Sequence, residues 1–288
     1  MALFPPLLLQ MPYHRHAIFS HGGDEQDGPA KILGDEMLRY FSGKLKVAAM
    51  AIAMLSAGVA LPAAAQTDPA PEIQIHGGVD LVSDYRFRGI SLSGGDIAIQ
   101  PSITAEHHSG VYAGLWASNI ENQPASGKAE VDIFAGYATE IASGTVLDVG
   151  LAYYWYPDGD KAAGPSDFFE ISSKLSHTLG PIEATGTIAY SWDQAALGDD
   201  NLYLGLGLAA GVPNTPLTLQ AGVGYSDGAL ADLAPHGHYW DWSVGASAVF
   251  GPITAGVKYV DTNIPHIGIK SVDKYYKARL IFSLGTYF

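Results

Sequence analysis

Apolar residues alternate with small or polar residues along most of the chain after residue 72, and this alternation limits the fold more than any other feature. From Leu202 to Leu208 every second residue is leucine, and the positions between them hold tyrosine or glycine. Successive side chains of a β-strand point to opposite faces, so a period of two indicates strands with one apolar face. We therefore expect an all-β fold.

Twelve segments of this kind follow one another, and most are about 8–14 residues long. An even number of such segments suits an antiparallel barrel whose tilted strands cross a membrane. The segments span residues 73–88, 97–107, 111–118, 129–141, 145–156, 167–178, 182–192, 201–211, 217–226, 239–250, 253–260 and 275–288.

The connections between these segments differ in length in a regular way. Those after even-numbered segments are tight, whereas those after odd-numbered segments are longer, at residues 89–96, 119–128, 157–166, 193–200, 227–238 and 261–274. Short periplasmic turns and longer outer loops are typical of outer-membrane barrels. The sequence thus predicts a transmembrane antiparallel up-and-down β-barrel of twelve strands, with both ends in the periplasm.

Aromatic residues recur on the apolar face near the predicted outer ends of the strands, where amphipathic rings meet the membrane boundary. This upper set is Tyr85, Phe87, Tyr153, Trp155, Tyr190, Trp192, Tyr225, Trp240, Trp242, Tyr259 and Tyr276, and the lower set is Phe250, Tyr287 and Phe288. The chain ends on Phe288 after an alternating strand. We interpret Phe288 as a C-terminal signal for the outer-membrane insertion machinery.

An export signal precedes the barrel. Lys44 and Lys46 are followed by an apolar run at 47–61 and by small residues up to Ala65. This order is typical of a secretory signal peptide, here residues 37–65, and the run is short for a membrane anchor, which is the alternative. We expect Met37 to be the true start, residues 1–36 to be an upstream non-native extension, and residues 66–288 to be the mature barrel.

The composition excludes several classes of function. The chain has no cysteine, so disulfides and cysteine-based metal or redox sites are excluded. It has 29 acidic residues against 15 lysines and arginines, which argues against a nucleic-acid partner. We expect no cofactor, and as partners the outer-membrane lipids with lipopolysaccharide and small solutes.

Charged residues occupy the face that would line the lumen. Bases gather on the first and last predicted strands and acids on strands across the barrel, so a narrow lumen would have opposed charged walls that filter ions. The alternative is that these charges pair in a plugged lumen. The predicted pore-lining residues are Arg86, Arg88, Glu130, Asp132, Asp148, Lys258, Lys277 and Arg279.

Two weaker ideas concern ions. The predicted lumen-facing strand positions hold nine acids and six bases, which predicts a mild preference for cations. The predicted outer loops are acidic, with Glu121 among their residues, and clustered carboxylates suit calcium or magnesium. The alternative is a simple solvated surface.

Other functions stay open. A lipid-modifying enzyme would need a serine beside a histidine that an acid or amide orients. His236 and His238 lie in an outer loop near Ser226 and Asp227, but no histidine lies beside a serine at a defensible cross-strand spacing. We expect no enzyme. A non-conducting structural or adhesive barrel is the other alternative, although loops of about 8–14 residues are short for recognition.

Three stretches carry a resemblance to a known family. They are the run from Val79 to Ser91, which includes Ser83-Asp-Tyr-Arg-Phe-Arg-Gly-Ile-Ser91, then Gln100-Pro-Ser102, and then the run from Gly110 to Ser118. Together they resemble the TorF family of proteobacterial outer-membrane proteins, also called the Gcw_chp family. The resemblance implies a porin-like barrel with no catalytic residues.

Overall fold

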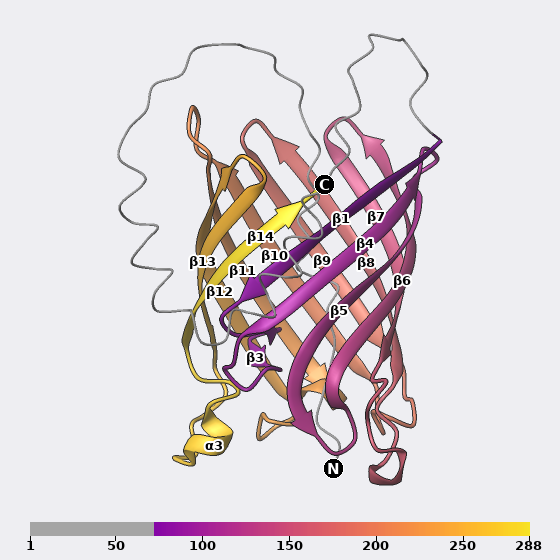
Figure 1. The fold of residues 1–288 in the computed structure, drawn as a ribbon, viewed down its shortest axis with the longest axis vertical. Coiled ribbons are helices and arrows are strands. Elements are labelled where there is room, and N and C mark those ends of the chain that lie inside the picture. Colours follow the sequence, from indigo (N-terminus) through magenta and orange to yellow (C-terminus); the bar gives the residue numbers. More distant parts are fainter. Residues whose placement is uncertain (1–71) are drawn as a thin grey trace. The chain divides into compact units, whose positions relative to one another are not determined.

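A computed structural model describes residues 72–288, and these residues form a closed barrel of twelve antiparallel strands (Figure 1). The predicted extension 1–36 and the signal peptide 37–65 lie outside the described residues. The barrel strands are β1 (Ile73–Val82), β4 (Ala98–His107), β5 (Val111–Gln123), β6 (Gly127–Ala142), β7 (Thr145–Trp155), β8 (Phe168–Leu179), β9 (Ile182–Ser191), β10 (Asn201–Gly211), β11 (Leu217–Gly228), β12 (His238–Phe250), β13 (Ile253–Thr262) and β14 (Arg279–Tyr287). The predicted fold class and strand number are confirmed.

The first and last strands close the barrel. β1 pairs with β14 from Gly78 opposite Tyr287 to Val82 opposite Ser283. Beyond this ladder, the amide of Phe288 donates to the carbonyl of Gly77 at 2.9 Å, and the amide of Gly77 donates back at 3.1 Å. Because the barrel is closed, no strand has an open edge. An open edge in lipid would leave backbone amides and carbonyls without hydrogen bonds.

The outer surface of the strands is apolar. Ile133, Leu206, Val244 and Phe282 are each at least 44% exposed, although each lies within a strand. The residues between them point into the barrel and are small, polar or buried. Apolar residues outside and polar residues inside are the arrangement of a transmembrane barrel.

Long connections gather at one end of the barrel, the lower end in Figure 1, where α3 (Lys270–Asp273) also lies. We call this the outer end and the opposite one the inner end. Residues 156–167, 192–200, 229–237 and 263–278 are long outer connections, as predicted. The connection between β5 and β6 is short, contrary to the prediction for 119–128, because both strands run on until Gln123 pairs with Gly127.

The largest departure from prediction is at β1, which ends at Val82 instead of residue 88. Residues 83–97 leave the wall and contain a small hairpin of β2 (Arg86–Phe87) and β3 (Ile90–Ser91). Its turn places Arg88 at φ +47° and Gly89 at φ +83°, left-handed backbone that ends an extended strand. We call residues 83–97 the plug.

The aromatic prediction is partly confirmed. Trp155, Tyr190, Trp192, Trp240 and Trp242 lie on the outer surface, with exposed fractions of 37–48%. Three predicted members are instead enclosed, since Tyr85, Phe87 and Tyr276 are each only 2% exposed.

Tyr287 of the lower set also turns inward, because its hydroxyl donates to a carboxylate oxygen of Asp80 at 2.5 Å. Phe250 and Phe288 face outward, with exposed fractions of 60% and 67%.

Candidate functional site

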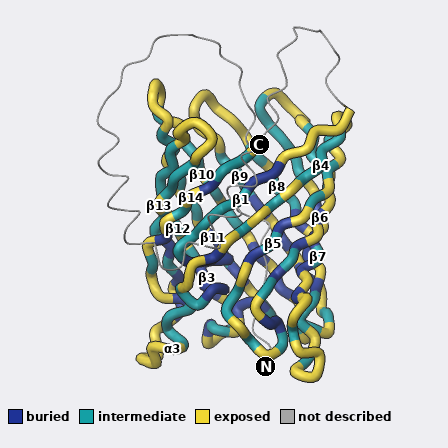
Figure 2. Tube along the Cα trace, viewed as in Figure 1, coloured by how far each residue is buried: buried dark blue, intermediate teal, exposed yellow. Residues whose placement is uncertain are grey.

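The plug fills the outer half of the lumen. Nine of its side chains are at most 6% exposed, although they belong to a connection between strands. In Figure 2 the buried parts of the chain gather around β3. These side chains are Asp84, Tyr85, Arg86, Phe87, Arg88, Ile90, Ser91, Leu92 and Ser93.

Arg88 joins the plug to the far wall. Its Nη2 donates to both carboxylate oxygens of Glu170 on β8, each at 2.8 Å. β8 is five strands from β1 in one direction around the barrel and seven in the other, so this ion pair spans the lumen. The Arg88 guanidinium also lies 4.4 Å from the ring centre of Phe87 and 4.2 Å from that of Tyr203. Such stacking is favourable for a desolvated guanidinium.

A hydroxyl from another strand holds the backbone of the same residue. The Tyr239 hydroxyl on β12 donates to the carbonyl of Arg88 at 2.9 Å. Arg88 has a positive φ, a backbone conformation that costs free energy in a non-glycine residue. Such a conformation is kept where contacts with the surrounding structure hold it. The carbonyl contact and the Glu170 ion pair fix the tip of the hairpin from two strands of the wall.

Arg86 fastens the plug to the connection between β13 and β14. Its Nε lies 2.8 Å from the Asp84 carboxylate, and its Nη1 donates to the carbonyls of Gly89 at 2.9 Å and Lys277 at 2.8 Å. Asp84 in turn accepts a hydrogen bond from the Ser91 hydroxyl at 2.5 Å. The two plug arginines are therefore both neutralised by buried acids.

A third set of contacts joins the plug to β5 and β6. The Tyr85 hydroxyl donates to Glu130 at 3.0 Å, and its ring meets that of Trp116 edge-on at 5.3 Å. The amide of Glu121 donates to the carbonyl of Leu92 at 2.8 Å. The plug thus contacts the wall on several sides.

The predicted pore-lining residues fall into two groups. Glu130 and Asp132 point inward from β6 and are fully buried. Asp148 accepts a hydrogen bond from the Tyr112 hydroxyl at 2.7 Å, and Lys258 lies on the same face of β13 as the buried Val260. These four residues come from wall strands, as the sequence indicated.

The other group departs from prediction. Arg86 and Arg88 lie on the plug and not on a wall strand, and Lys277 is an exposed residue of the connection before β14. Arg279 does begin β14, and its Nη2 donates to the carbonyl of Gly95 in the plug at 3.0 Å. The continuous basic wall expected from strands 1 and 12 is therefore wrong, because the chain turns inward after Val82.

Sequence reasoning missed the partners of the plug. Glu170 was recognisable as a lumen-facing acid, but Tyr203 and Tyr239 carry no sequence signal that distinguishes them from other inward aromatics. The length of the predicted strand 73–88 was no signal either, because β6 runs for 16 residues as an unbroken strand of the wall.

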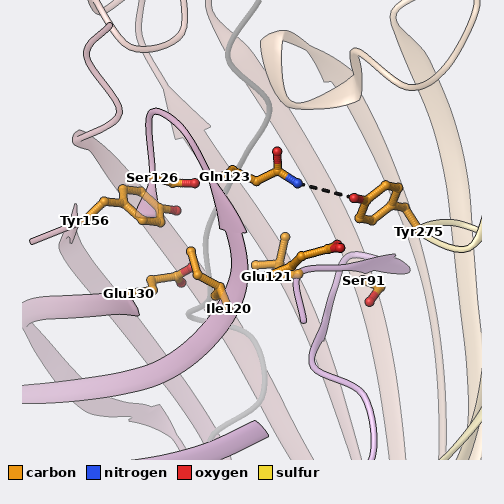
Figure 3. Close-up of a pocket in the computed structure, with 9 residues that line it drawn as sticks. Ser91, Ile120, Glu121, Gln123, Ser126, Glu130, Tyr156 and Tyr275 are labelled. Atoms are coloured by element: carbon orange, nitrogen blue, oxygen red, sulfur yellow. Dashed lines mark hydrogen bonds between the residues drawn. The ribbon is translucent and has the colours of Figure 1, made fainter. Parts of the chain in front are cut away.

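A small pocket lies where the plug meets β5 and β6 (Figure 3), and its cavity volume of about 10 Å³ leaves room for about one water molecule. Its lining residues are Ser91, Leu92, Ile120, Glu121, Gln123, Ser126, Glu130, Tyr156 and Tyr275.

An ion pair lies at the edge of this pocket. Lys274 Nζ lies 2.5 Å from Glu121 Oε1. The hydrogen bond to Glu121 raises the pKa of Lys274, which belongs to the connection outside the strands. Lys274 therefore stays charged and neutralises Glu121.

The described histidines show one contact with a serine. His107 Nδ1 lies 2.8 Å from Ser109 Oγ in an exposed turn at the inner end. Within residues 72–288 no acid is hydrogen-bonded to this histidine, and no three acid or histidine side chains are grouped to hold a metal. No helix in that range is long and apolar enough to cross a membrane.

Several solved structures resemble the barrel at low sequence identity. The NanC porin matches with a TM-score of 0.49 and 11% identity over 75% of this chain and 99% of that chain. The KdgM porin in complex with disordered oligogalacturonate matches with a TM-score of 0.47 and 9% identity over 74% and 97%. An outer-membrane channel from Pseudomonas putida F1 matches with a TM-score of 0.46 and 11% identity over 77% and 99%.

The sequence comparisons give a family. No curated protein matches the chain. A family model described as "Bacterial protein of unknown function (Gcw_chp)" matches residues 66–288, the whole of the predicted mature part. The chain therefore belongs to the Gcw_chp family.

Proposed function

We propose that this protein is a porin-like outer-membrane channel for passive diffusion of small solutes or ions, and that the plug restricts its outer end. The main observation behind this proposal is that the barrel is closed and apolar on its outside. The residues that obstruct its interior belong to a connection between strands and not to the wall. The predicted signal peptide 37–65 and the terminal Phe288 support export and insertion into the outer membrane. The narrower TorF assignment stays a prediction.

The inner half of the lumen supports conduction. Its wall carries Asp148, Lys174, Thr187 and Lys258 on inward faces, and Asp148 and Lys174 are opposite one another in the ladder of β7 and β8. Polar and charged residues line the interior of barrels that hold water. A solute that passes the plug would meet a hydrated path.

The plug supports a restriction that can change. It is held by ion pairs and hydrogen bonds to Glu130, Glu170 and Tyr239, and not by a strand ladder with the wall. Such contacts can break without unfolding the barrel, because β1 and β4 remain paired along their whole length. We infer a narrow path with a plug that opens in part or briefly.

The predicted charge filter takes a revised form. Arg86 is neutralised by Asp84 of the plug and Arg88 by Glu170 of the wall, whereas Glu130 and Asp132 belong to none of the ion pairs between described residues. An excess of buried carboxylates favours cations over anions in a narrow path. We propose a mild preference for cations.

Single cysteines can test conduction, because the chain has none of its own. Thr187 on β9 faces the lumen and is 5% exposed, whereas its neighbour Ile188 faces outward and is 55% exposed. We expect a charged, water-soluble thiol reagent to reduce the current through Thr187→Cys barrels in planar bilayers. Ile188→Cys is the matched control, and its current should not change.

The alternatives give different results. A non-conducting structural barrel would show no current steps in either variant, even after the plug is shortened. A lipid-modifying enzyme would release or transfer acyl chains when the purified protein is mixed with phospholipid or lipopolysaccharide. Equal effects of the reagent on both cysteine variants would mean that current does not pass through the lumen.

A further inference from the structure

Two buried acids of β6 lack a base of their own. The part of the barrel that the plug fills contains acids and bases that are each at most 5% exposed, namely Asp84, Glu130, Asp132 and Glu170 with Arg86 and Arg88. Asp84 pairs with Arg86, and Glu170 pairs with Arg88. Glu130 and Asp132 belong to none of the ion pairs between described residues. The buried acids therefore outnumber the buried bases by two.

Hydrogen bonds do not replace the missing charge. Glu130 accepts hydrogen bonds from the hydroxyls of Tyr85 and Tyr156, but a hydroxyl carries no positive charge. Asp132 is fully buried, and within residues 72–288 neither of its oxygens has a hydrogen-bond partner. The pocket beside Glu130 holds about one water molecule, which would also be neutral. A buried carboxyl in such surroundings takes up a proton instead of carrying its charge.

The described groups that face this pair supply no uncompensated positive charge. They are Glu170 on β8, Tyr154 and Tyr156 on β7, Tyr85 and Arg88 of the plug, and Glu121 on β5 with its partner Lys274. Arg88 is bound to Glu170. Lys174 lies farther along β8, opposite Asp148 in the ladder, and Lys128 is exposed at the outer end of β6.

This arrangement links the plug to protons. We propose that Glu130 and Asp132 form a proton-binding site that keeps the plug in place, and that loss of the proton at alkaline pH releases the plug. The two carboxyls lie two residues apart on one face of β6, about 7 Å along the strand, so they ionise as a pair. Both can be charged at low cost only where water reaches them, which requires the plug to leave β6.

The sign of the pH effect follows from this difference. The site binds its proton more tightly with the plug in place than with the plug released, so raising the pH favours release. One extra proton in the plugged state changes the ratio of released to plugged protein by up to about tenfold per pH unit. Buried carboxyls lose their proton as late as about pH 8–9, so we expect release on the alkaline side of neutral.

The same ionisation bears on the proposed channel. Release would leave the carboxylates of Glu130 and Asp132 charged beside an opened path, where they would favour cations. The proton site goes beyond the proposed channel function, and it can be measured without current.

Acrylamide quenching of Trp116 fluorescence measures release of the plug. Trp116 is 6% exposed, and its ring meets that of Tyr85 in the plug at 5.3 Å. The other four tryptophans lie on the outer surface, and the difference between native protein and Trp116→Phe isolates the enclosed one. We expect quenching of Trp116 to rise by at least about threefold between about pH 6 and about pH 9, and to fall again when the pH is lowered.

Neutral variants identify the proton site. Asp132→Asn and Glu130→Gln each keep a neutral side chain of similar shape at every pH, and we expect the rise in quenching to be lost in the first and reduced in the second. Asp148→Asn is the matched control, because Asp148 is an inward acid that lies opposite Lys174, and its response should equal that of the native protein. Heat-dependent gel mobility shows that each variant is folded at both pH values.

Either of two results would overturn the proposal. One is equal quenching of Trp116 in the native protein at both pH values. The other is a native pH response in both Asp132→Asn and Glu130→Gln, which would place the titrating group elsewhere. A barrel that releases its plug at alkaline pH but carries no current would contradict the channel and leave the proton site standing.

Discussion

Arg88 Nη2 lies 2.8 Å from each carboxylate oxygen of Glu170, and both side chains are 1% exposed. This ion pair joins the tip of the plug to β8 across the lumen. Two Arg88 nitrogens, Nε and Nη1, have no hydrogen-bond partner among the described residues, so stacking on Phe87 and Tyr203 accompanies the ion pair. The Arg88–Glu170 ion pair therefore holds the tip of the plug against β8.

Removing one partner of this ion pair should destabilise the barrel strongly. Arg88→Met leaves Glu170 buried without a counter-charge, and we expect a loss of about 3–5 kcal/mol in the free energy of unfolding. Urea unfolding in lipid vesicles, followed by tryptophan fluorescence, measures it. The double variant Arg88→Met with Glu170→Met removes both charges and should recover most of the loss. A single variant within about 1 kcal/mol of the native protein would contradict a buried, neutralising pair.

Arg86 should protect the connection between β13 and β14 from proteolysis. Its Nη1 donates to the Lys277 carbonyl, and hydrogen bonds from a charged group contribute about 1.5–3 kcal/mol each. We expect Arg86→Met to speed tryptic cleavage after Lys270, Lys274 and Lys277 by about tenfold or more.

Asp160→Ala provides a control for that experiment. Asp160 caps the short helix η1 (Lys161–Ala163) in another outer connection, where its carboxylate accepts from the amide of Ala162 at 2.9 Å. Cleavage after Lys270 to Lys277 should not change in this variant. Equal cleavage in Arg86→Met and native protein would show that the plug does not hold that connection.

Phe288 should act in insertion more than in stability. Its backbone bonds to Gly77 survive in Phe288→Ala, and the lost ring is 67% exposed. We expect several-fold less folded protein in the outer-membrane fraction, measured by the heat-dependent gel mobility of barrels. Phe250→Ala removes a ring that is 60% exposed at the inner end of β12, and it should change the amount little. Equal losses in both variants would assign Phe288 a general role in lipid contact.

The alternating pattern predicted the barrel well because lipid and lumen impose opposite demands on successive residues. The segment from Leu202 to Leu208 lies in β10 with its leucines facing outward. The predicted alternation of short and long connections also holds, except at the short connection between β5 and β6. The failure at residues 83–88 has a physical reason. Tyr85 and Phe87 alternate with charged residues in the plug as they would in the wall, so local periodicity cannot separate the two.

The binding partners of the plug depend on contacts distant in sequence. Arg88 and Glu170 are 82 residues apart, and Arg86 and Lys277 are 191 apart. These contacts depend on barrel closure and on the inward turn of the chain after Val82, and a single sequence does not reveal which residues they bring together. The inward acids Glu130 and Asp132 were recognisable, whereas their lack of basic partners required the structure.

The most direct test of the central claim is single-channel recording with and without the plug. Replacing residues 84–95 with a short glycine-serine linker removes the enclosed side chains and keeps β1 paired with β4. Shortening the outer connection 156–167 provides the control. We predict small or rare current steps for the native protein and for the control, and larger, sustained steps for the plug-deleted barrel. Equal conductance with and without the plug would contradict the account.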